Sequence, residues 1–253
     1  AIHLAIVTLA SAGSHIVASK TLYGGTHNLL SYTLPRFGIT TSFVDTSDPD
    51  AFARAIKPNT VMLFTETVSN PDCSVADIPR LASVAHEFGL PLVVDATLTT
   101  PYLMKPIEFG ADIVIHSLTK FIGGHGTTIG GVVIDGGVFD WLASAEKFPT
   151  LCQPYDGFDG LNFAEEFGPS AFIIRARREG LRDFGACLSA TSAFQLLQGV
   201  ETLSLRMARH VSNTEAVVDF LCEQESVEQV FHPRLKEHRD HELSRVLYPK
   251  GTG

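Results

Sequence analysis

Continuous apolar runs alternate with amphipathic stretches through the first half of the chain. Runs that are apolar throughout, rather than at every second position, are typical of strands buried on both faces of a sheet. The stretches between them have the character of the helices that connect parallel strands. The pattern therefore predicts a parallel α/β sheet with helices on both sides. The expected strands are 14–19, 40–44, 61–65, 92–95, 113–116 and 131–134.

Start and stop signals mark the helices between these strands. Asp48 is expected to act as an N-cap, with Pro49 at the first helical position. A second helix is closed by Gly89, and a third is expected to stop before Pro35. The helices expected in the first half are 1–12, 24–34, 48–56 and 76–88.

The pattern changes from about Trp141. Residues 147–170 are rich in Pro, Gly, Phe and acidic side chains without a clear period. This predicts a long loop, of a type often placed near active sites. The segment Val227–Phe231 has the composition of a strand and would open a second domain. Further helices are expected at about 172–184, 189–198 and 201–224.

We predict two domains, both cut short. Residues 1–200 are expected to form a large domain, and residues 201–253 a linking helix and the beginning of a smaller C-terminal domain. The chain opens on an apolar stretch that reads as the middle of a helix, and it stops at Gly251–Gly253. We therefore expect the polypeptide to be incomplete at both ends.

Composition narrows the class of protein. Of the 253 residues, 45% are hydrophobic, and 19 basic against 28 acidic side chains give a net charge of −9. Since no basic block supplies phosphate contacts, nucleic acid is not expected as the main partner. The four cysteines form no CxxC pair, which argues against a zinc site or disulfide framework and fits a reducing compartment. No apolar run is long enough to cross a bilayer, so no membrane partner is expected.

Polar side chains cluster where three of the expected strands end. Glu66–Asn70 follows one strand, Asp95 ends a second, and Ser117–Lys120 follows a third. Open α/β sheets bind ligands at the carboxyl ends of their strands. Three such segments on one edge predict a ligand site more strongly than any one of them alone.

The residue types at this edge point to pyridoxal phosphate (PLP). A deprotonated Lys120 amine is a nucleophile that forms a Schiff base with a carbonyl. Ser117 and Thr119 carry hydroxyls suited to a phosphate, and Asp95 is suited to hold a pyridine nitrogen in its protonated form. An imine partner, a phosphate anchor and a pyridinium partner are what PLP requires of a protein.

Each of these residues also has an ordinary structural explanation. Asp95 alone would be a turn or capping residue about as often as a ligand. Lys120 alone would more often be a solvated surface lysine. Ser117 and Thr119 would more often be capping or turn hydroxyls. Their combination at one strand end favours the functional interpretation.

Tyr23 and Asn70 extend the candidate site. Tyr23 begins the segment Tyr23–Thr26 at the start of a helix, where an aromatic ring can stack on a planar group. An ordinary packing role for Tyr23 is at least as common. Asn70, followed by Pro71, is by default a turn residue. In the functional interpretation its amide bonds to the ring hydroxyl of the cofactor.

Other classes of protein are less well supported. For a nicotinamide-binding GxGxxG motif, Gly124 and Gly126 would require glycine at position 129, where the chain has Ile129, and a P-loop is absent. The three histidines of residues 232–241 lack the cysteine or carboxylate set of a metal site, so no metal is expected. A catalytically incomplete fragment or a scaffold subunit remains an alternative from a different class.

Taken together, the segments resemble the Cys/Met-metabolism PLP enzymes, which include cystathionine synthases and lyases, methionine γ-lyase and the O-acetylhomoserine sulfhydrylases. The resemblance runs the whole length of the chain. Within the family the chain is most similar to O-acetylhomoserine sulfhydrylase, through segments 33–38, 120–127, 147–170 and 197–203. The segments that fall in the family order are 23–26, 66–71, 93–97, 100–103 and 116–120.

The resemblance implies a fold, a cofactor and an activity. The fold is aspartate-aminotransferase-like (fold type I), with a mostly parallel seven-stranded sheet, helices on both faces and a smaller α/β C-terminal domain. The cofactor is pyridoxal 5'-phosphate. The activity is γ-replacement on O-acetyl-L-homoserine with sulfide or a thiol, giving homocysteine and acetate in methionine biosynthesis. Cystathionine γ-synthase, γ-lyase and methionine γ-lyase activities remain alternatives.

The resemblance also implies roles for three residues at the reacting end of the cofactor. Lys120 would hold PLP as a Schiff base and move protons. Asp95 would bind the pyridine nitrogen. Tyr23 would stack on the ring and assist proton transfer.

Four further residues match family positions. Ser117 and Thr119 would bind the phosphate, and Asn70 would contact the ring hydroxyl. Glu66 matches a family position for which no role is implied.

The chain departs from the family pattern at two positions and lacks several expected segments. Ala96 stands where the family usually has asparagine, and Leu118 where it often has alanine. A phosphate-binding Ser-Gly loop is expected before Ala1, and an arginine for the substrate carboxylate beyond Gly253. A tyrosine and an arginine lent by a neighbouring subunit imply a homodimer or homotetramer with shared sites. A cytoplasmic location is expected.

Overall fold

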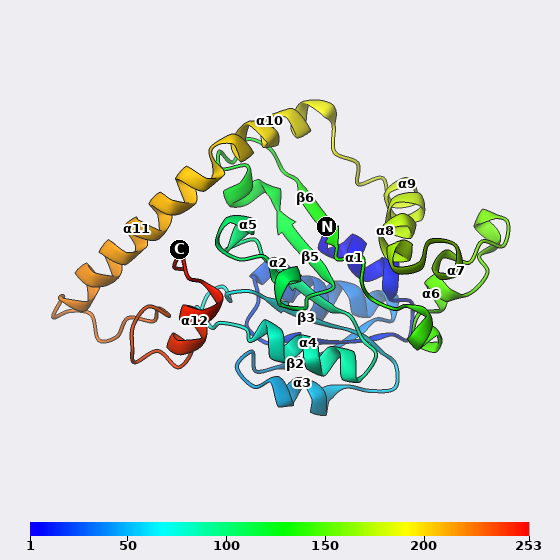
Figure 1. Ribbon diagram of the computed structural model, residues 1–253, viewed down its shortest axis with the longest axis horizontal. Helices are drawn as coiled ribbons and strands as arrows, with labels where there is room; N and C mark the ends of the chain where they lie inside the picture. The colour runs from blue at the N-terminus through cyan, green and yellow to red at the C-terminus, as the bar shows by residue number, and fades with distance from the viewer. Residues whose placement is uncertain (253) are drawn as a thin grey trace.

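The computed structural model describes residues 1–252, and one six-stranded sheet forms its centre (Figure 1). The strand order is β2-β1-β3-β4-β5-β6. Strands β1 to β5 run parallel, and β6 pairs antiparallel with β5 at one edge. The bounds are β1 His15–Ser19, β2 Thr40–Val44, β3 Thr60–Glu66, β4 Leu92–Asp95, β5 Ile113–Ser117 and β6 Gly131–Asp135.

The mostly parallel α/β sheet is confirmed, but its strand number is not seven. All six strands expected in the first half form, and the described residues contain no seventh. Val227–Phe231, expected to be a strand, is irregular. An isolated strand leaves its backbone N–H and C=O groups unpaired, and here no neighbouring strand accepts them.

The helix signals in the sequence act largely as expected. The side chain of Asp48 accepts a hydrogen bond from the amide of Ala51 and caps α3, whose first residue is Pro49. Asp77 caps α4 in the same way. The helices of the first half are α1 Ile2–Leu9, α2 Gly24–Asn28, α3 Pro49–Ala55, α4 Ile78–Glu87 and α5 Thr100–Leu103.

The expected stop before Pro35 is wrong. After α2 the helical path continues through a π-helical turn, Leu29–Thr33, and a 3₁₀ turn, Leu34–Phe37. Pro35 is tolerated because it lies in the first positions of the 3₁₀ turn, where a missing N–H costs no hydrogen bond. The run ends at Gly38, whose φ of 77° is the left-handed conformation that glycine adopts most easily.

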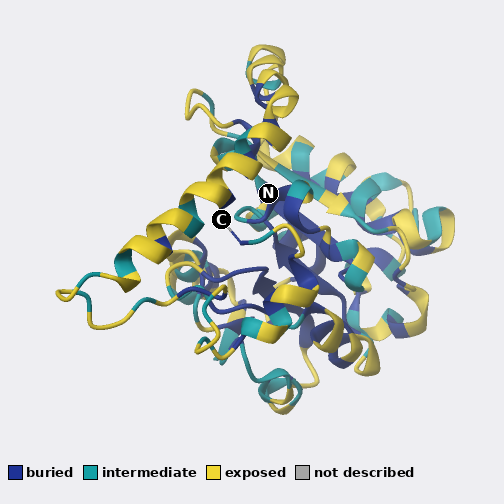
Figure 2. Ribbon diagram, turned by 60° about the vertical axis from the view of Figure 1, so that its left-hand side comes forward, coloured by how far each residue is buried: buried dark blue, intermediate teal, exposed yellow. Residues whose placement is uncertain are grey.

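Two apolar layers cover the two faces of the sheet, and the buried segments gather at the centre of the molecule (Figure 2). Consecutive residues of β3 point in opposite directions, so Phe64 joins the layer of α1 while Leu63 joins the layer of α3 and α4. The two layers include Trp141 and Phe52, both almost fully buried. A fully buried side chain of this kind contributes roughly 1.5–3 kcal/mol. This double burial explains the apolar runs of the central strands β3 and β4, which are buried at every position.

Residues 147–170 do not form the expected loop near the site. They fold into short helical turns that pack against α1, and the hydroxyl of Thr150 donates to the carbonyl of Thr8. Phe148, Leu151 and Phe163 are buried in the same apolar layer as α1. Because each turn has only three to six residues, no single period is visible in the sequence.

The second half of the chain is helical and ends beside the sheet. A bent helical run over residues 171–184 is followed by α10 and the 20-residue α11, which extends away from the body (Figure 1). Leu247 and Tyr248 then return to the apolar layer of α4. No helix among residues 1–252 is both long and apolar enough to cross a membrane. The helices are α6 Pro149–Cys152, α7 Phe163–Phe167, α8 Ala171–Arg175, α9 Arg182–Phe184, α10 Ala190–Glu201, α11 Leu203–Cys222 and α12 His241–Leu247.

A buried aspartate joins α4 to the sheet. The Oδ2 atom of Asp112 lies 2.9 Å from Nε2 of His86 and accepts a 2.8 Å hydrogen bond from the amide of Leu92. The hydrogen bond to Asp112 raises the pKa of His86 above its usual value. A histidine whose folded-state pKa is raised stabilises the fold below its unfolded pKa, and this contribution is lost as pH rises through the folded pKa.

We predict that His86→Gln lowers the free energy of unfolding by about 0.5–1 kcal/mol at pH 6, a range set by solvent screening of the half-exposed His86 side chain. The loss at pH 8.5 should be smaller, because the imidazole is then neutral. Urea denaturation at the two pH values measures the difference, with exposed His3→Gln as control. Equal losses at both pH values would contradict the proposed charge dependence.

Candidate cofactor site

One cavity of about 1150 Å³ opens at the carboxyl ends of the central strands. It gathers side chains from the ends of β3, β4 and β5, from the start of α2 and from α11. Every residue that the sequence singled out for the site borders it. These residues are Tyr23, Glu66, Asn70, Asp95, Ser117, Thr119 and Lys120.

Asp95 ends β4 and is only 9% exposed. Its Oδ1 accepts hydrogen bonds from the amide of Thr97 at 2.9 Å and from the hydroxyl of Thr97 at 2.5 Å. Burial raises the pKa of Asp95, and the two bonds from Thr97 oppose this shift. Among residues 1–252, Oδ2 has no hydrogen-bond partner, so it is free to bind a donor in the cavity.

Thr97 connects the ends of two neighbouring strands. Its hydroxyl donates to Asp95 and accepts a 2.8 Å hydrogen bond from the amide of Ser117. Nearby, Nδ1 of His116 lies 3.0 Å from the carbonyl of Ala96. Thr97 thereby fixes the carboxylate relative to the segment that carries Lys120. Its position two residues after Asp95 was the only signal of this role in the sequence.

Lys120 lies on a π-type turn, Leu118–Ile122, that follows β5. Its backbone departs from helical geometry, with φ −87° and ψ −128°. The side chain is exposed in the open cavity, and Nζ lies 6.0 Å from the centroid of the Tyr23 ring. The amine and the aromatic face are therefore placed to contact the same bound molecule.

The two hydroxyls proposed for phosphate differ in their surroundings. The hydroxyl of Thr119 bonds to the backbone of Gly130, donating to its carbonyl at 3.3 Å and accepting from its amide at 3.0 Å. Ser117 has no such side-chain hydrogen bond among the described residues. Ser117 pairs with Gly131, where an added Cβ would lie 2.9 Å from Cβ of Ala1. Ala1 therefore lies beside the pair of strands that carries Ser117, and both residues border the cavity.

Tyr23 and Asn70 reach the cavity from two separate loops. The Tyr23 ring folds back over Gly25, where an added Cβ would lie 2.6 Å from Cε1 of the ring. Glu66 joins the two loops, because Oε1 accepts from the amide of Tyr23 at 2.8 Å and Oε2 from the amide of Asn70 at 3.2 Å. Burial raises the pKa of Glu66 to about 7, opposed by the bond from Tyr23 and assisted by the charge of Asp95.

Sequence reasoning missed Arg206, which reaches the cavity from α11. Its guanidinium donates to the carbonyls of Phe121 at 2.5 Å, Ile122 at 3.1 Å and Gly199 at 2.6 Å. It thereby ties α10 and α11 to the turn of Lys120. Nothing local in the sequence signals a contact between residues 85 positions apart.

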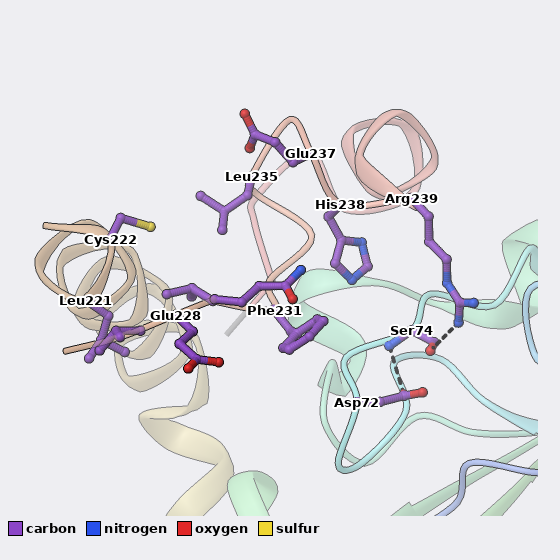
Figure 3. Close-up of a pocket in the computed structure, with 13 residues that line it drawn as sticks. Asp72, Ser74, Leu221, Cys222, Glu228, Phe231, Leu235, Glu237, His238 and Arg239 are labelled. Carbon is purple, nitrogen blue, oxygen red and sulfur yellow. Dashed lines mark hydrogen bonds between the residues drawn. The ribbon is translucent and has the colours of Figure 1, made fainter. Parts of the chain in front are cut away.

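A second cavity of about 640 Å³ lies apart from this site (Figure 3). It is bordered by the end of α11, by the irregular segment 227–231 and by the loop of Asp72 and Ser74. Arg239 donates to the hydroxyl of Ser74 at 2.8 Å, and the amide of Ser74 donates to Asp72. Within residues 1–252, the two cavities share no lining residue.

Comparison with known proteins agrees with this geometry. The model of a family described as Cys/Met metabolism PLP-dependent enzyme matches residues 1–252. Sulfhydrylase FUB7 of Fusarium oxysporum f. sp. lycopersici is 49% identical over 99% of this chain and 58% of its own. The homocysteine synthase of Schizosaccharomyces pombe is 47% identical over 100% of this chain and 59% of its own. The chain thus spans less than two thirds of the length of these relatives.

Solved structures extend the likeness to the fold. A Campylobacter jejuni protein assigned as an O-acetylhomoserine (thiol)-lyase, with N'-pyridoxyl-lysine-5'-monophosphate in its structure, has a TM-score of 0.94 and 34% identity. The match covers 99% of this chain and 62% of that one. O-acetylhomoserine sulfhydrylase of Wolinella succinogenes has a TM-score of 0.87 and 38% identity, over 99% and 69% of the two chains.

Gly199 of α10 packs directly against the backbone that follows the Lys120 turn. An added Cβ at Gly199 would lie 2.1 Å from the carbonyl oxygen of Gly123, which is backbone and cannot rotate away. Gly199→Ala should therefore displace α10 and lower the free energy of unfolding by about 1–3 kcal/mol, the usual cost of overpacking. Thermal or urea denaturation measures it. Gly24→Ala, with nothing within 4 Å of the new Cβ, is the control, and equal stability of the two variants would refute the contact.

Proposed function

Because the chain belongs to the Cys/Met metabolism PLP-dependent enzyme family, we propose that it catalyses γ-replacement on O-acetyl-L-homoserine. Sulfide would displace acetate and give homocysteine, a step of methionine biosynthesis, whereas a thiol in its place would give the corresponding thioether. The names of the Schizosaccharomyces pombe and Wolinella succinogenes relatives support this choice of reaction. The observation that carries the proposal is that Asp95 and Lys120, at the ends of adjacent strands, border one cavity.

The residues of the cavity fit PLP at both ends of its ring. The free Oδ2 of Asp95 suits the pyridine nitrogen, and its charge would keep that nitrogen protonated. Ser117 suits the phosphate, with Thr119 close by but bonded to Gly130. The buried hydroxyl of Thr26 also borders the cavity and has no hydrogen-bond partner in the described chain, as expected for a polar ligand site.

The remaining contacts define a place for the reacting carbon. Lys120 suits the aldehyde, Tyr23 the face of the ring, and Asn70 the ring hydroxyl. When bound, PLP supplies a protonated ring that accepts the electron pair left by removal of the substrate Cα proton. The Lys120 amine would be the base that takes this proton and later returns it. The centroid of the Tyr23 ring lies 6.0 Å from Nζ of Lys120. Tyr23 orients the cofactor ring and assists the proton transfer.

Two further properties are part of the proposal. A cytoplasmic location is supported by four free cysteines, which fit a reducing compartment. A homodimer or homotetramer with shared sites is supported by the family resemblance. It is also supported by exposed apolar side chains on α10, where Phe194 and Leu197 are each 62% exposed.

The reaction is tested by analysing products from O-acetyl-L-homoserine with and without sulfide. We predict homocysteine and acetate only when sulfide is present, and no turnover by Lys120→Ala. The exposed Lys105→Ala variant should retain wild-type activity. Release of ketobutyrate without sulfide would instead indicate a lyase, and full activity of Lys120→Ala would refute the assignment of the base.

Asp95→Asn tests the electrostatic part of the site. Asparagine can still accept the hydrogen bonds from Thr97 but carries no charge, so we expect turnover to fall by roughly 100-fold or more. Burial raises the pKa of Asp95, so wild-type unliganded protein should lose stability as pH rises from the unfolded-state pKa of this carboxyl to its raised folded-state pKa. The variant should lack this component of the pH slope. Turnover within twofold of wild type would contradict the role of the charge.

A further inference from the structure

Glu66 occupies a position between the two loops that carry ring contacts. It ends β3 in register with Asp95 of β4 and is only 6% exposed. One carboxylate oxygen accepts from the amide of Tyr23, and the other accepts from the amide of Asn70. Both donors are backbone groups, so the carboxylate fixes the main chain of each loop rather than a mobile side chain.

The loop that carries Asn70 is also held on the side away from the cavity. Beyond Asn70, Arg239 donates to the hydroxyl of Ser74 (Figure 3), and Asp240 accepts from the amide of Val75. The hydroxyl of Tyr248 donates to the carbonyl of Thr67 at 2.9 Å. These contacts anchor the loop from behind, and Glu66 connects this anchored part of the chain to the start of α2.

We propose that Glu66 is a positioning residue whose carboxylate holds Tyr23 and Asn70 at a fixed separation, and whose protonation releases at least one of them. The inference rests on the proposed function, which gives the two residues their contacts to the cofactor ring. A carboxylate can accept from two N–H donors at once. Protonation converts one carboxylate oxygen into a hydroxyl group. That oxygen then accepts a hydrogen bond from its backbone N–H less well than the charged oxygen does.

The charges around Glu66 give the direction of its titration. Burial raises its pKa to about 7, while the amides of Tyr23 and Asn70 favour the charged form, and Asp95 and Asp72 disfavour it. The carboxylate is therefore ionised above this value and protonated below it. The charged or titratable groups that act on Glu66 or border its cavity are the Ala1 amine, His3, Tyr23, Asp72, Asp95, His116, Lys120, Cys187, Arg206 and His210.

Protonation of Glu66 has opposite effects on the free energy of unfolding and on the contact between the Tyr23 and Asn70 loops. An acid whose folded-state pKa is raised destabilises the fold at high pH, and this cost disappears as pH falls through the folded pKa. Wild-type protein should thus become globally more stable between pH 8 and pH 6 while the contact between the two loops loosens. A hydrogen bond that does not depend on the protonation of Glu66 would not weaken while the whole protein becomes more stable.

Residue-resolved hydrogen exchange of the full chain, without substrate, tests the inference. The protection factors of the Tyr23 and Asn70 amides should be high at pH 8, and at least one should fall about tenfold at pH 6, the loss of one hydrogen bond. Glu66→Gln places an NH₂ group against one of the two donors. At least one amide should therefore lose about tenfold protection already at pH 8, without further change at pH 6.

Asp72→Asn is the matched control. It keeps the Glu66 contacts but removes a charge that raises the pKa of Glu66, so the change in protection should move to lower pH. Wild-type protection factors that stay constant from pH 8 to pH 6, or a Glu66→Gln variant with wild-type protection at pH 8, would overturn the inference. If Glu66→Gln does not fold, the wild-type and Asp72→Asn series decide it. Failure to form homocysteine would end the proposed function but leave these exchange results intact.

Discussion

The burial of one carboxylate at a strand end is the constraint on which the site depends. Asp95 is only 9% exposed and ends a strand that is buried at every position. An isolated charge is costly in such surroundings. The structure offsets part of this cost with two hydrogen bonds from Thr97, both to the same oxygen. The other oxygen is left for a donor in the cavity. A protonated ring nitrogen is a donor that would complete the balance of charge.

Thr97 also connects Asp95 to the rest of the site. By accepting from the amide of Ser117, Thr97 fixes the end of β5 relative to Asp95. The turn that follows β5 carries Lys120, and Arg206 bonds to its last carbonyl groups from α11. The relative placement of carboxylate and amine is therefore set by short backbone contacts on both sides, although the Lys120 side chain itself is exposed.

The sequence was most informative where local rules apply. The bounds of β2 and β4 were predicted correctly, because each is a short run between turn signals, and β4 is apolar up to Asp95. Asp95, Ser117 and Lys120 were brought together by the rule that ligands bind at the carboxyl ends of parallel strands. Their roles remain predictions, as does the division into domains 1–200 and 201–253.

Local rules failed where packing decides. The buried aromatic residues of 147–170 lie on turns too short to show a period, so a packed segment was mistaken for a loop near the site. Val227–Phe231 has strand composition, but no neighbouring strand pairs with it among the described residues. The role of Arg206 depends on how α11 lies against a turn 85 residues earlier, which no local pattern records. Glu66 was noticed in the sequence, but its bonds to two backbone amides appear only in three dimensions.

The most direct test of the central claim is chemical mapping of the amine that binds PLP. The protein is incubated with PLP, reduced with borohydride and digested, and the modified peptide is sequenced by mass spectrometry. We predict a single phosphopyridoxyl group on Lys120, and a loss of labelling when Asp95 is replaced by Asn at limiting PLP. Labelling spread over surface lysines such as Lys105, with none at Lys120, would contradict the account.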